Sequence, residues 1–529
     1  MTKTSQGQDV PVAAVGSSSF GRYAKISSEK TYNMFVSDSW LVNYPGYQVV
    51  AKLLPSGEGR GIFRSIRGGF MLVVVNSEVY QLNTALGAIL IGNLASNTGE
   101  VFMDENLNNQ ICVVDGVNAY IYNYSLPPNI TIQSVGGGLI PKYVTYHNTY
   151  FLFGNGNTTS NGAAWYAYGY NSPTTIIQIS QLALQTKPDY AIAVIRIPAQ
   201  SANVLVFGTS VCEIHTQIGG TQNYRRVNSI SVDYGCISVS TIAASDNFIM
   251  WLAVNAENAP VIMVYAGQGA TPVSTDGIDY VMGTLKRPDK STALFSRVDG
   301  HLFYQITFFD PQDNLTLAFD FESKKFFHLS DQYLNYHPAR QYAYFNQQTY
   351  FASINNACIY SIDTDITVIN ENVPGQTLDP ALVFDMQRIR ITDNMIQPNS
   401  DRFVVNRLTL TIEQGQDPNA FPPSNITYVI TEQGDLVLSE WGVPIVTEDS
   451  WGGGPTYTMP YQPRVDLSIS KDSGVTWSNT VGRQLNPIGY RQNILHWDSL
   501  GACNTITFKF RFWTTARTVI GPCSMEIHE

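Results

Sequence analysis

The feature that most constrains the fold of this chain is a pattern that recurs seven times between Phe63 and Asp363. Each copy is a short apolar run, a tight polar turn and a longer apolar and aromatic run. The turns contain Gly68-Gly69, Asn108-Asn109, His147-Asn148, Ser201-Ala202-Asn203, Asp246-Asn247, Asp299-Gly300 and Asn346-Gln347. The runs that follow occupy residues 70–75, 111–114, 150–153, 204–207, 248–252, 301–309 and 349–354. The mean spacing of roughly 46 residues is typical of β-propellers, so we expect about seven blades.

The composition agrees with an all-β protein that contacts partners over much of its surface. Only 14% of the 529 residues are charged, whereas 12% are aromatic, and strands favour aromatic and β-branched residues. The net charge of −11 argues against a basic face that neutralises phosphates tightly. The pairs Arg225-Arg226 and Lys324-Lys325 are isolated, and we interpret them as solvated turns.

The sequence offers no membrane, secretory or metal signal. The longest apolar stretches, such as 70–75, are far shorter than a membrane span, so no direct membrane insertion is predicted. The first residues lack the apolar core of a signal peptide, which favours synthesis in a cytoplasm. The six cysteines form no CxxC pair and are expected to be buried free thiols; they are Cys112, Cys212, Cys236, Cys358, Cys503 and Cys523.

We divide the chain into an N-terminal arm and first propeller segment (1–61), a propeller (62–380) and a C-terminal β-rich, sandwich-like domain (381–529). The first ~20 residues are small and polar and are expected to be a flexible arm, and residues 21–61 hold few strand signals. Thr275-Asp276 is expected to cap a short helix over 277–285, and residues 371–376 are expected to be the linker between the two domains. In the last part we expect strands at 403–412, 427–430, 464–470 and 505–512. The alternation over 505–513 predicts one buried and one wet face.

One motif is typical of sialidases. Residues 470–477 read Ser-Lys-Asp-Ser-Gly-Val-Thr-Trp and fit the Asp-box pattern. Asp472 can accept hydrogen bonds from the backbone of the turn, Gly474 permits a positive φ, and Trp477 can pack beneath the hairpin. We therefore predict a hairpin here, not a reaction.

A second sialidase-like fragment is Arg196-Ile197-Pro198, but Ile195 stands where those enzymes have an aromatic residue. A complete set of clamping arginines, a Tyr–Glu pair and an acid cannot be assembled. We expect His147, His215 and His301 to be structural residues in hairpins, and His496-Trp497-Asp498 lacks a nucleophile motif. The glycine triplets at 136–138 and 452–454 precede no phosphate-binding helix. We predict no catalytic, cofactor-binding or metal-binding residues, no cofactor and no enzymatic activity.

Several stretches, taken in order, resemble the tail hub proteins of short-tailed phages, which are also called packaged-DNA stabilisation proteins or tail accessory factors. Near the start, Asn33-Met34 and Pro45-Gly46 are similar to the opening "N-M … P-G" of that family. Residues 206–214 resemble its "F-G-S-x-x-x-E" strand, and residues 264–274 its "G-x-G-x-x-x-P" segment before a short helix. Residues 315–320, 467–477 and 521–528 resemble later strands. The segment between Gln414 and Tyr461 is longer than in that family.

The resemblance implies a structural virion protein in the phage tail, made in the host cytoplasm. It implies a homo-hexameric nozzle ring below the portal and its adaptor ring, which continues the DNA channel and retains packaged DNA. The partners implied are the portal-adaptor (head-tail connector) ring, a tail needle or plug, and a tailspike or tail fibre, with only non-specific proximity to channel DNA. We expect acidic and amide residues of inter-blade loops to line that channel. The alternatives are a glycan-binding or sialidase-like propeller and a propeller scaffold outside virions.

Overall fold

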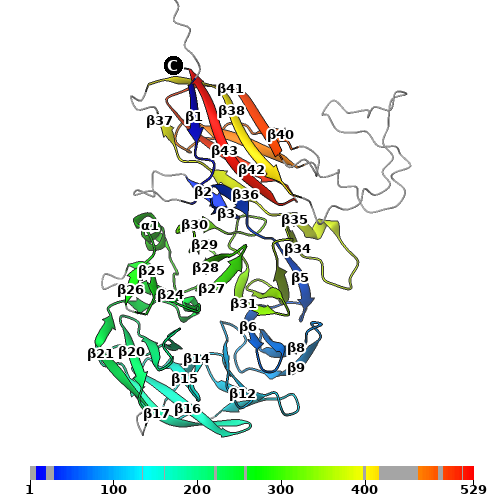
Figure 1. Cartoon of the computed structure of the whole chain (residues 1–529). Coiled ribbons are helices and arrows are strands. Elements are labelled where there is room, and N and C mark those ends of the chain that lie inside the picture. Colours follow the sequence, from blue (N-terminus) through cyan, green and yellow to red (C-terminus); the bar gives the residue numbers. More distant parts are fainter. Residues whose placement is uncertain are drawn as a thin grey trace, which may run out of the picture.

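The structure is a computed structural model of the chain. It describes residues 8–18, 29–133, 135–136, 138–159, 161–219, 223–254, 259–267, 269–396, 401–415, 463–485, 492–514 and 516–528. These residues form two β-rich parts, a propeller and a sandwich, which lie one above the other in Figure 1. The all-β fold class is confirmed.

The propeller has seven blades among the described residues, each built around an antiparallel sheet. Blade 1 holds β6 (Gly59–Ser65), β7 (Phe70–Val75), β8 (Glu78–Leu82) and β9 (Ala88–Asn93). Blade 2 holds β10 (Phe102–Glu105), β11 (Gln110–Val114), β12 (Ala119–Asn123) and β13 (Ile130–Gln133). Blade 3 holds β14 (Pro141–His147), β15 (Tyr150–Asn155), β16 (Ala164–Ser172) and β17 (Thr175–Ala183). Blade 4 holds β18 (Ala193–Arg196), β19 (Asn203–Phe207), β20 (Cys212–Gln217) and β21 (Tyr224–Val232).

The last three blades are less regular. Blade 5 holds β22 (Gly235–Cys236), the 3-10 helix η1 (Val239–Thr241), β23 (Ala243–Ala244), β24 (Ile249–Val254), β25 (Pro260–Tyr265) and β26 (Ala270–Pro272). Blade 6 holds β27 (Ser291–Val298), β28 (His301–Phe308), β29 (Leu315–Asp320) and β30 (Lys325–His328). Blade 7 holds β31 (Ala339–Phe345), β32 (Gln348–Ser353), β33 (Cys358–Ile362) and the early strand β5 (Tyr47–Lys52). Because β5 is the outer strand of blade 7 and leads directly into blade 1, it closes the ring.

Six of the seven predicted turns join the first and second strands of their blades, and the turn of blade 5 joins β23 to β24. Three of them place two successive residues at positive φ: Asn148 and Thr149 at 44° and 79°, Asp299 and Gly300 at 51° and 85°, and Asn346 and Gln347 at 48° and 63°. Two residues of this kind match the right-handed twist of the flanking strands, which explains why Asn, Asp and Gly recur there. The repeat therefore predicted the blades.

The propeller core consists of the faces of neighbouring blades. All of β7 is buried. Leu72 lies in a cluster with Val113 of blade 2, whereas its neighbour Val73 lies in a cluster with Ile359 of blade 7. Because successive side chains of a strand point to opposite faces, each blade packs against both of its neighbours.

The predicted short helix is present as α1 (Asp276–Thr284), which lies between blades 5 and 6. Thr275 is its N-cap and accepts a backbone hydrogen bond from Asp279, but its hydroxyl makes no cap hydrogen bond. The buried residues Ile278 and Met282 pack the helix onto the cluster shared by blades 5 and 6.

The C-terminal part contains two facing sheets. One has the order β3 (Met34–Ser37), β4 (Trp40–Asn43), β43 (Thr518–His528), β38 (Phe403–Gln414) and β41 (Gln492–Cys503), with β1 (Gln8–Val12) also on β43. The other contains β36 (Arg388–Ile391), β42 (Thr505–Trp513), β39 (Arg464–Ser470) and β40 (Val481–Gln484), with β37 (Met395–Ile396) also on β42. As predicted, β42 alternates: Phe508 and Phe510 are buried, and Lys509 between them is partly exposed. The predicted sandwich is confirmed.

The N-terminal expectations were wrong for the described residues. Residues 8–12 are not a flexible arm, because β1 pairs with β43 from Gln8 opposite Ile527 to Val12 opposite Cys523. The segment expected to hold few strands contains β2 (Lys30–Tyr32), β3, β4, β5 and β6. Of these, β3 and β4 belong to a sheet of the sandwich, and β2 pairs with one strand of the propeller and one of the sandwich. These strands are short and gain their stability from partners distant in sequence, which local patterns do not reveal.

The prediction of a linker at 371–376 was also wrong. It is the loop of a hairpin between β34 (Val368–Asn370) and β35 (Val383–Asp385), which includes the 3-10 helix η2 (Pro380–Leu382). Because β34 pairs in parallel with β5, the hairpin extends the sheet of blade 7. The chain crosses to the sandwich at Met386 and Gln387. The predicted strand at 427–430, the long segment between Gln414 and Tyr461, and the glycines at 452–454 fall on residues 416–462, outside the described residues.

Candidate functional site

The junction of the two parts is formed by one continuous sheet. Strand β2 lies between β30 of blade 6 and β36 of the sandwich, so ten strands of both parts belong to a single sheet. Tyr32 pairs in parallel with His328, and Lys30 pairs with Ile391 in antiparallel register. Backbone hydrogen bonds therefore tie the propeller to the sandwich, and a hinge at this point would have to break them.

Asn33 continues this connection and explains part of the "N-M" motif. Its φ of 54° is left-handed, which Asn tolerates better than most residues. Its side-chain Nδ2 donates to Ser330 Oγ of the propeller at 2.9 Å and to the backbone oxygen of Gln387 at 2.8 Å. The next residue, Met34, is fully buried. The motif thus fixes a turn at which three distant segments meet.

Arg390 is a buried cation that holds the N-terminal segment. Its Nε donates to the backbone oxygen of Ala14 at 2.9 Å, and its two Nη atoms donate to the backbone oxygens of Ser17 and Ala13, both at 2.9 Å. It also forms an ion pair with Glu29. Burial lowers the pKa of the guanidinium, and the Glu29 carboxylate opposes this effect.

Arg388, two residues earlier, forms a second bridge from the same strand. Its Nη1 donates to the backbone oxygen of Thr514 in the sandwich at 3.1 Å. Its Nη2 donates to the backbone oxygen of Thr367, just before β34 of the propeller, at 2.6 Å. Together, the two arginines of β36 connect the sandwich with both the N-terminal segment and blade 7.

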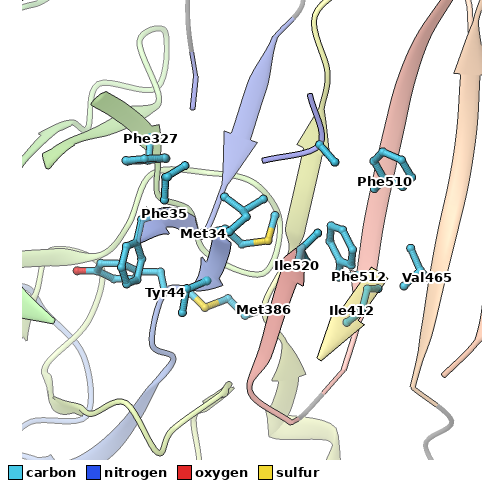
Figure 2. Packing of buried hydrophobic residues seen from close by; sticks show 14 of the residues in the cluster. Met34, Phe35, Tyr44, Phe327, Met386, Ile412, Val465, Phe510, Phe512 and Ile520 are labelled. Carbon is cyan, nitrogen blue, oxygen red and sulfur yellow. The ribbon is translucent and has the colours of Figure 1, made fainter. Parts of the chain in front are cut away.

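An apolar core runs through the junction. Figure 2 shows Met34 and Met386 between the propeller-side rings of Tyr44 and Phe327 and the sandwich residue Ile520. All belong to one buried cluster that continues into the sandwich. Flexible methionines fill irregular gaps between elements that meet at an angle. The propeller and sandwich therefore share a core and do not have two separate ones.

The axis of the propeller is occupied by a second group, the central polar cluster, which we define as Glu100, Thr292, Arg340 and Gln341. The Glu100 carboxylate of blade 2 accepts hydrogen bonds from Thr292 Oγ1 of blade 6, at 3.2 Å, and from Gln341 Nε2 of blade 7. Burial raises the pKa of Glu100, and the nearby Arg340 guanidinium counteracts it. Because these bonds connect blades on opposite sides of the ring, side chains close the axis at this level.

Two buried carboxylates explain the "F-G-S-x-x-x-E" motif. Asp189 accepts hydrogen bonds from the backbone N–H groups of Thr209, Ser210 and Val211 at 2.7–3.0 Å. A Cβ on Gly208 would lie 2.2 Å from Asp189 Oδ2, so only glycine fits there.

Glu213, the acid that ends this motif, accepts hydrogen bonds from the backbone N–H groups of Gln185 and Thr186 and from His215 Nε2 at 3.1 Å. Burial alone raises the pKa of Glu213, but the hydrogen bonds from His215 and Thr186 outweigh it and lower the pKa to about 2. The motif therefore fixes a turn and an inter-blade contact.

The Asp-box has the predicted hairpin geometry. Ser470 Oγ donates to Asp472 Oδ1 at 2.7 Å, and Thr476 N donates to the same oxygen at 2.9 Å. Gly474 has a φ of 91°. Trp477 is partly exposed, and Lys509 Nζ lies over its ring, 4.5 Å from the ring centre. The motif closes the loop between β39 and β40 in the sandwich, far from blade 4, which carries Arg196.

The other catalytic candidates do not assemble into a site. Arg196 is the exposed last residue of β18. Asp498 binds Arg407 Nε at 2.6 Å, and His496 Nδ1 lies 3.1 Å from Thr409 Oγ1. His147 and His301 make hydrogen bonds to Tyr224 and Asp320, as expected of structural histidines in hairpins. All six cysteines are free and buried, as predicted.

Among the described residues, one small pocket lies on the propeller. It has a volume of about 140 Å³ and lies between the hairpin turns of blades 6 and 7, next to Asp299 and Gln347. Small-molecule sites usually enclose about 300–1,000 Å³. Within the described ranges, no three His, Cys, Asp or Glu side chains are grouped so that they could hold a metal ion. No helix in these ranges has the length and apolar character needed to cross a membrane.

Sequence reasoning missed Arg388, Arg390 and the central polar cluster. The only local signal for the arginines is their position at alternate residues of a four-residue strand in a chain with few charges. Glu100 and Gln341 carry no local signal, since they meet only when the ring closes.

The fold and these contacts define an all-β protein in which a seven-bladed propeller and a β-sandwich share one sheet and one core. A family model of the β-propeller of bacteriophage P22 Gp10 matches residues 29–367, and a model of the β-sandwich of the same protein matches residues 450–528. The chain belongs to this family, the tail hub and DNA-stabilisation proteins of short-tailed phages. It is therefore a structural protein of a phage tail.

The comparison with curated proteins found no match. Similar solved structures include a streptogramin B lyase, with 10% identity and a TM-score of 0.40 over 60% of this chain and 97% of that chain. A virginiamycin B lyase from Staphylococcus aureus has 10% identity and a TM-score of 0.41 over 60% of this chain and 99% of that chain. The WD40 propeller domain of Doa1 has 8% identity and a TM-score of 0.39 over 60% of this chain and 97% of that chain.

Proposed function

We propose that six copies of this chain form the tail hub, a nozzle ring below the portal and its adaptor ring. The ring continues the DNA channel and helps to retain packaged DNA. It anchors a tail needle or plug and the tailspikes or tail fibres. The observation that carries this proposal is the family match over both the propeller and the sandwich.

The junction supports this role mechanically. A wall that holds pressurised DNA needs subunits that do not flex at their centre. Here, the ten-stranded sheet, the buried Arg388 of β36 and the shared apolar core all join the propeller to the sandwich. Packed cores and backbone ladders resist small displacements. Each copy would therefore act as one rigid segment of the ring.

The central polar cluster supports a DNA path that lies outside the propeller. Glu100, Thr292 and Gln341 close the propeller axis with hydrogen bonds. Duplex DNA, whose major groove alone is about 12 Å wide, is too wide to pass through this axis. The channel would therefore run between copies and not through a propeller. The net charge of −11 suits such a conduit, since like charge disfavours adhesion of phosphates. We propose that acidic and amide residues of inter-blade loops line it, and a strongly basic lumen would contradict this.

The direct test is to determine the copy number and position of this chain in intact particles by electron cryo-microscopy and quantitative mass spectrometry. We expect six copies per tail, next to the portal-adaptor complex. The proposal would be overturned if the chain is absent from particles, remains monomeric and releases sugar from glycans. Loss of that release in Arg196→Ala would favour a sialidase-like enzyme instead.

A further inference from the structure

The outer strands of the blades differ in how their free edges are protected. In blades 6 and 7, the outer strands β30 and β5 are covered by β2 and β34. In blade 4, β21 carries Arg225 and Arg226, and in blade 5, β26 has three residues and ends at Pro272. Added strands, charges, short length and proline are the usual means of preventing unwanted pairing at a sheet edge. Four successive blades therefore have protected edges.

The outer strands of the other three blades lack an added strand, a charge and a proline. In the part of the chain that the structure describes, no strand pairs with the outer edges of β9, β13 and β17. None of the three strands contains a charged residue or a proline. They expose large apolar side chains, which are Ile89 (51%), Leu90 (49%), Ile132 (57%), Ile177 (50%) and Ile179 (42%). We call these five residues the outer patch.

The three edges are next to each other. A Cβ on Gly92 of β9 would lie 2.4 Å from Ile130 of β13, so blades 1 and 2 touch at their outer strands. Gln133 at the end of β13 donates to the backbone oxygen of Thr174 at 2.7 Å and accepts from Ile176 N at 3.1 Å. Blades 2 and 3 are thus also connected there. The outer patch spans three blades, and β17 lies at the end of the propeller remote from the sandwich (Figure 1).

The sequence around the outer patch is almost free of charge. Residues 79–99 contain no Asp, Glu, Lys or Arg, and between Asp115 and Lys187 the only charged residue is Lys142. The solvent-exposed surface of a monomer normally carries charges of both signs. A surface that has few charges and exposes apolar side chains is typical of the core of a protein interface. An open and apolar sheet edge also favours addition of another strand.

We propose that the outer patch is the surface with which one copy of this chain contacts the next copy in the ring, and this assignment rests on the hexameric hub proposed above. Each copy carries a net charge of −11, so two copies repel each other on average. The outer patch contains no charged side chains, so it avoids this repulsion whichever face of the neighbour it meets. A closed ring of six requires heterologous contacts, so the patch of one copy meets a different face of its neighbour.

The test uses particles assembled in infected cells with a photo-crosslinking amino acid in place of Ile179. We expect irradiation to join two copies of this chain, and mass spectrometry of the product would identify the face of the neighbour that receives the patch. A crosslink from residue 179 only to a different virion protein, such as a needle or spike, would overturn the assignment. The absence of any crosslink to a second copy would overturn it as well.

A second measurement uses the variant with both Ile177→Lys and Ile179→Lys, which supplies the missing edge charges. We expect at least tenfold fewer copies per particle, with an unchanged melting temperature of the purified chain, because exposed substitutions cost little stability. Val475→Lys, at an exposed apolar residue of the Asp-box loop, is the control and should assemble normally. If the double variant is incorporated normally, the assignment of the outer patch is overturned and the proposed hub is not. If the wild-type chain is absent from particles, both the assignment and the proposed hub are overturned.

Discussion

The Arg390 guanidinium donates a hydrogen bond from Nε to the backbone oxygen of Ala14, 2.9 Å away, across 376 positions of the chain. The same side chain reaches Ala13, Ser17 and Glu29. The N-terminal segment is therefore held in the sandwich by a single buried cation, in addition to the pairing of β1 with β43.

Replacement of this cation should loosen the N-terminal segment. Arg390→Met leaves buried carbonyl groups and the Glu29 carboxylate without their donor, and breaking a buried pair in this way costs about 3–5 kcal/mol. We expect a loss of this size in the free energy of unfolding measured with urea, together with faster proteolysis within residues 8–18. The control is Arg407→Met, which breaks the exposed pair with Asp498 and should change little. Equal effects of the two variants would argue against a special role for Arg390.

A matched pair of glycine substitutions tests the backbone contacts of the propeller. A Cβ on Gly46 would lie 2.1 Å from the backbone oxygen of Val368 in β34, whereas a Cβ on Gly283 in α1 would meet no atom within 4 Å. Gly46→Ala should therefore destabilise the chain by about 1–3 kcal/mol or more. Gly283→Ala should stabilise it by about 0.5–1 kcal/mol, because alanine is the better helix former. Thermal unfolding measures both, and a stable Gly46→Ala variant would contradict the close contact with β34.

His328 should make stability depend on pH in the weakly acidic range. Burial, with a contribution from Lys30, lowers the pKa of His328 from 6.5 to about 3. Between these values the unfolded chain binds a proton and the folded chain does not. The contribution of His328 is therefore complete above pH 6.5 and decreases as the pH falls towards 3, by about 1.4 kcal/mol per pH unit. His328→Gln should reduce the slope of the unfolding free energy between pH 6 and 4, and a parallel curve would contradict this.

Glu213 should act at lower pH. Its pKa is about 2 in the folded chain, against an ordinary value of 4.5. Its contribution is present above pH 4.5 and is lost as the pH falls towards 2, because the unfolded chain takes up the proton first. Trp165 packs edge-on against His215, the partner of Glu213, so tryptophan fluorescence can follow the transition. Glu213→Gln should weaken the acid dependence below pH 4.5 and leave the His328 range unchanged.

The strength of the sequence-based prediction differs between the two parts of the chain. The seven hairpins, the helix beginning after Thr275 and the alternation of β42 were predicted because their causes are local. Asn148 and Asp299 adopt positive φ in tight turns, and alternation follows from strand geometry. The Asp-box was correctly read as a hairpin for the same reason. The roles of Arg390, Asn33 and Glu100 could not be predicted, since their partners lie far away in the sequence.

The sequence by itself predicted about seven blades and the all-β class, because turns and periodicity act over a few positions. Only the tertiary structure decided that β5 closes the propeller, that β1 to β4 join the sandwich and that β2 fuses the two sheets. These choices depend on which strand edges meet after the chain has closed long loops. A three-residue strand such as β2 has little preference of its own, so its place is set by the backbone hydrogen bonds that Tyr32 and Lys30 find on either side.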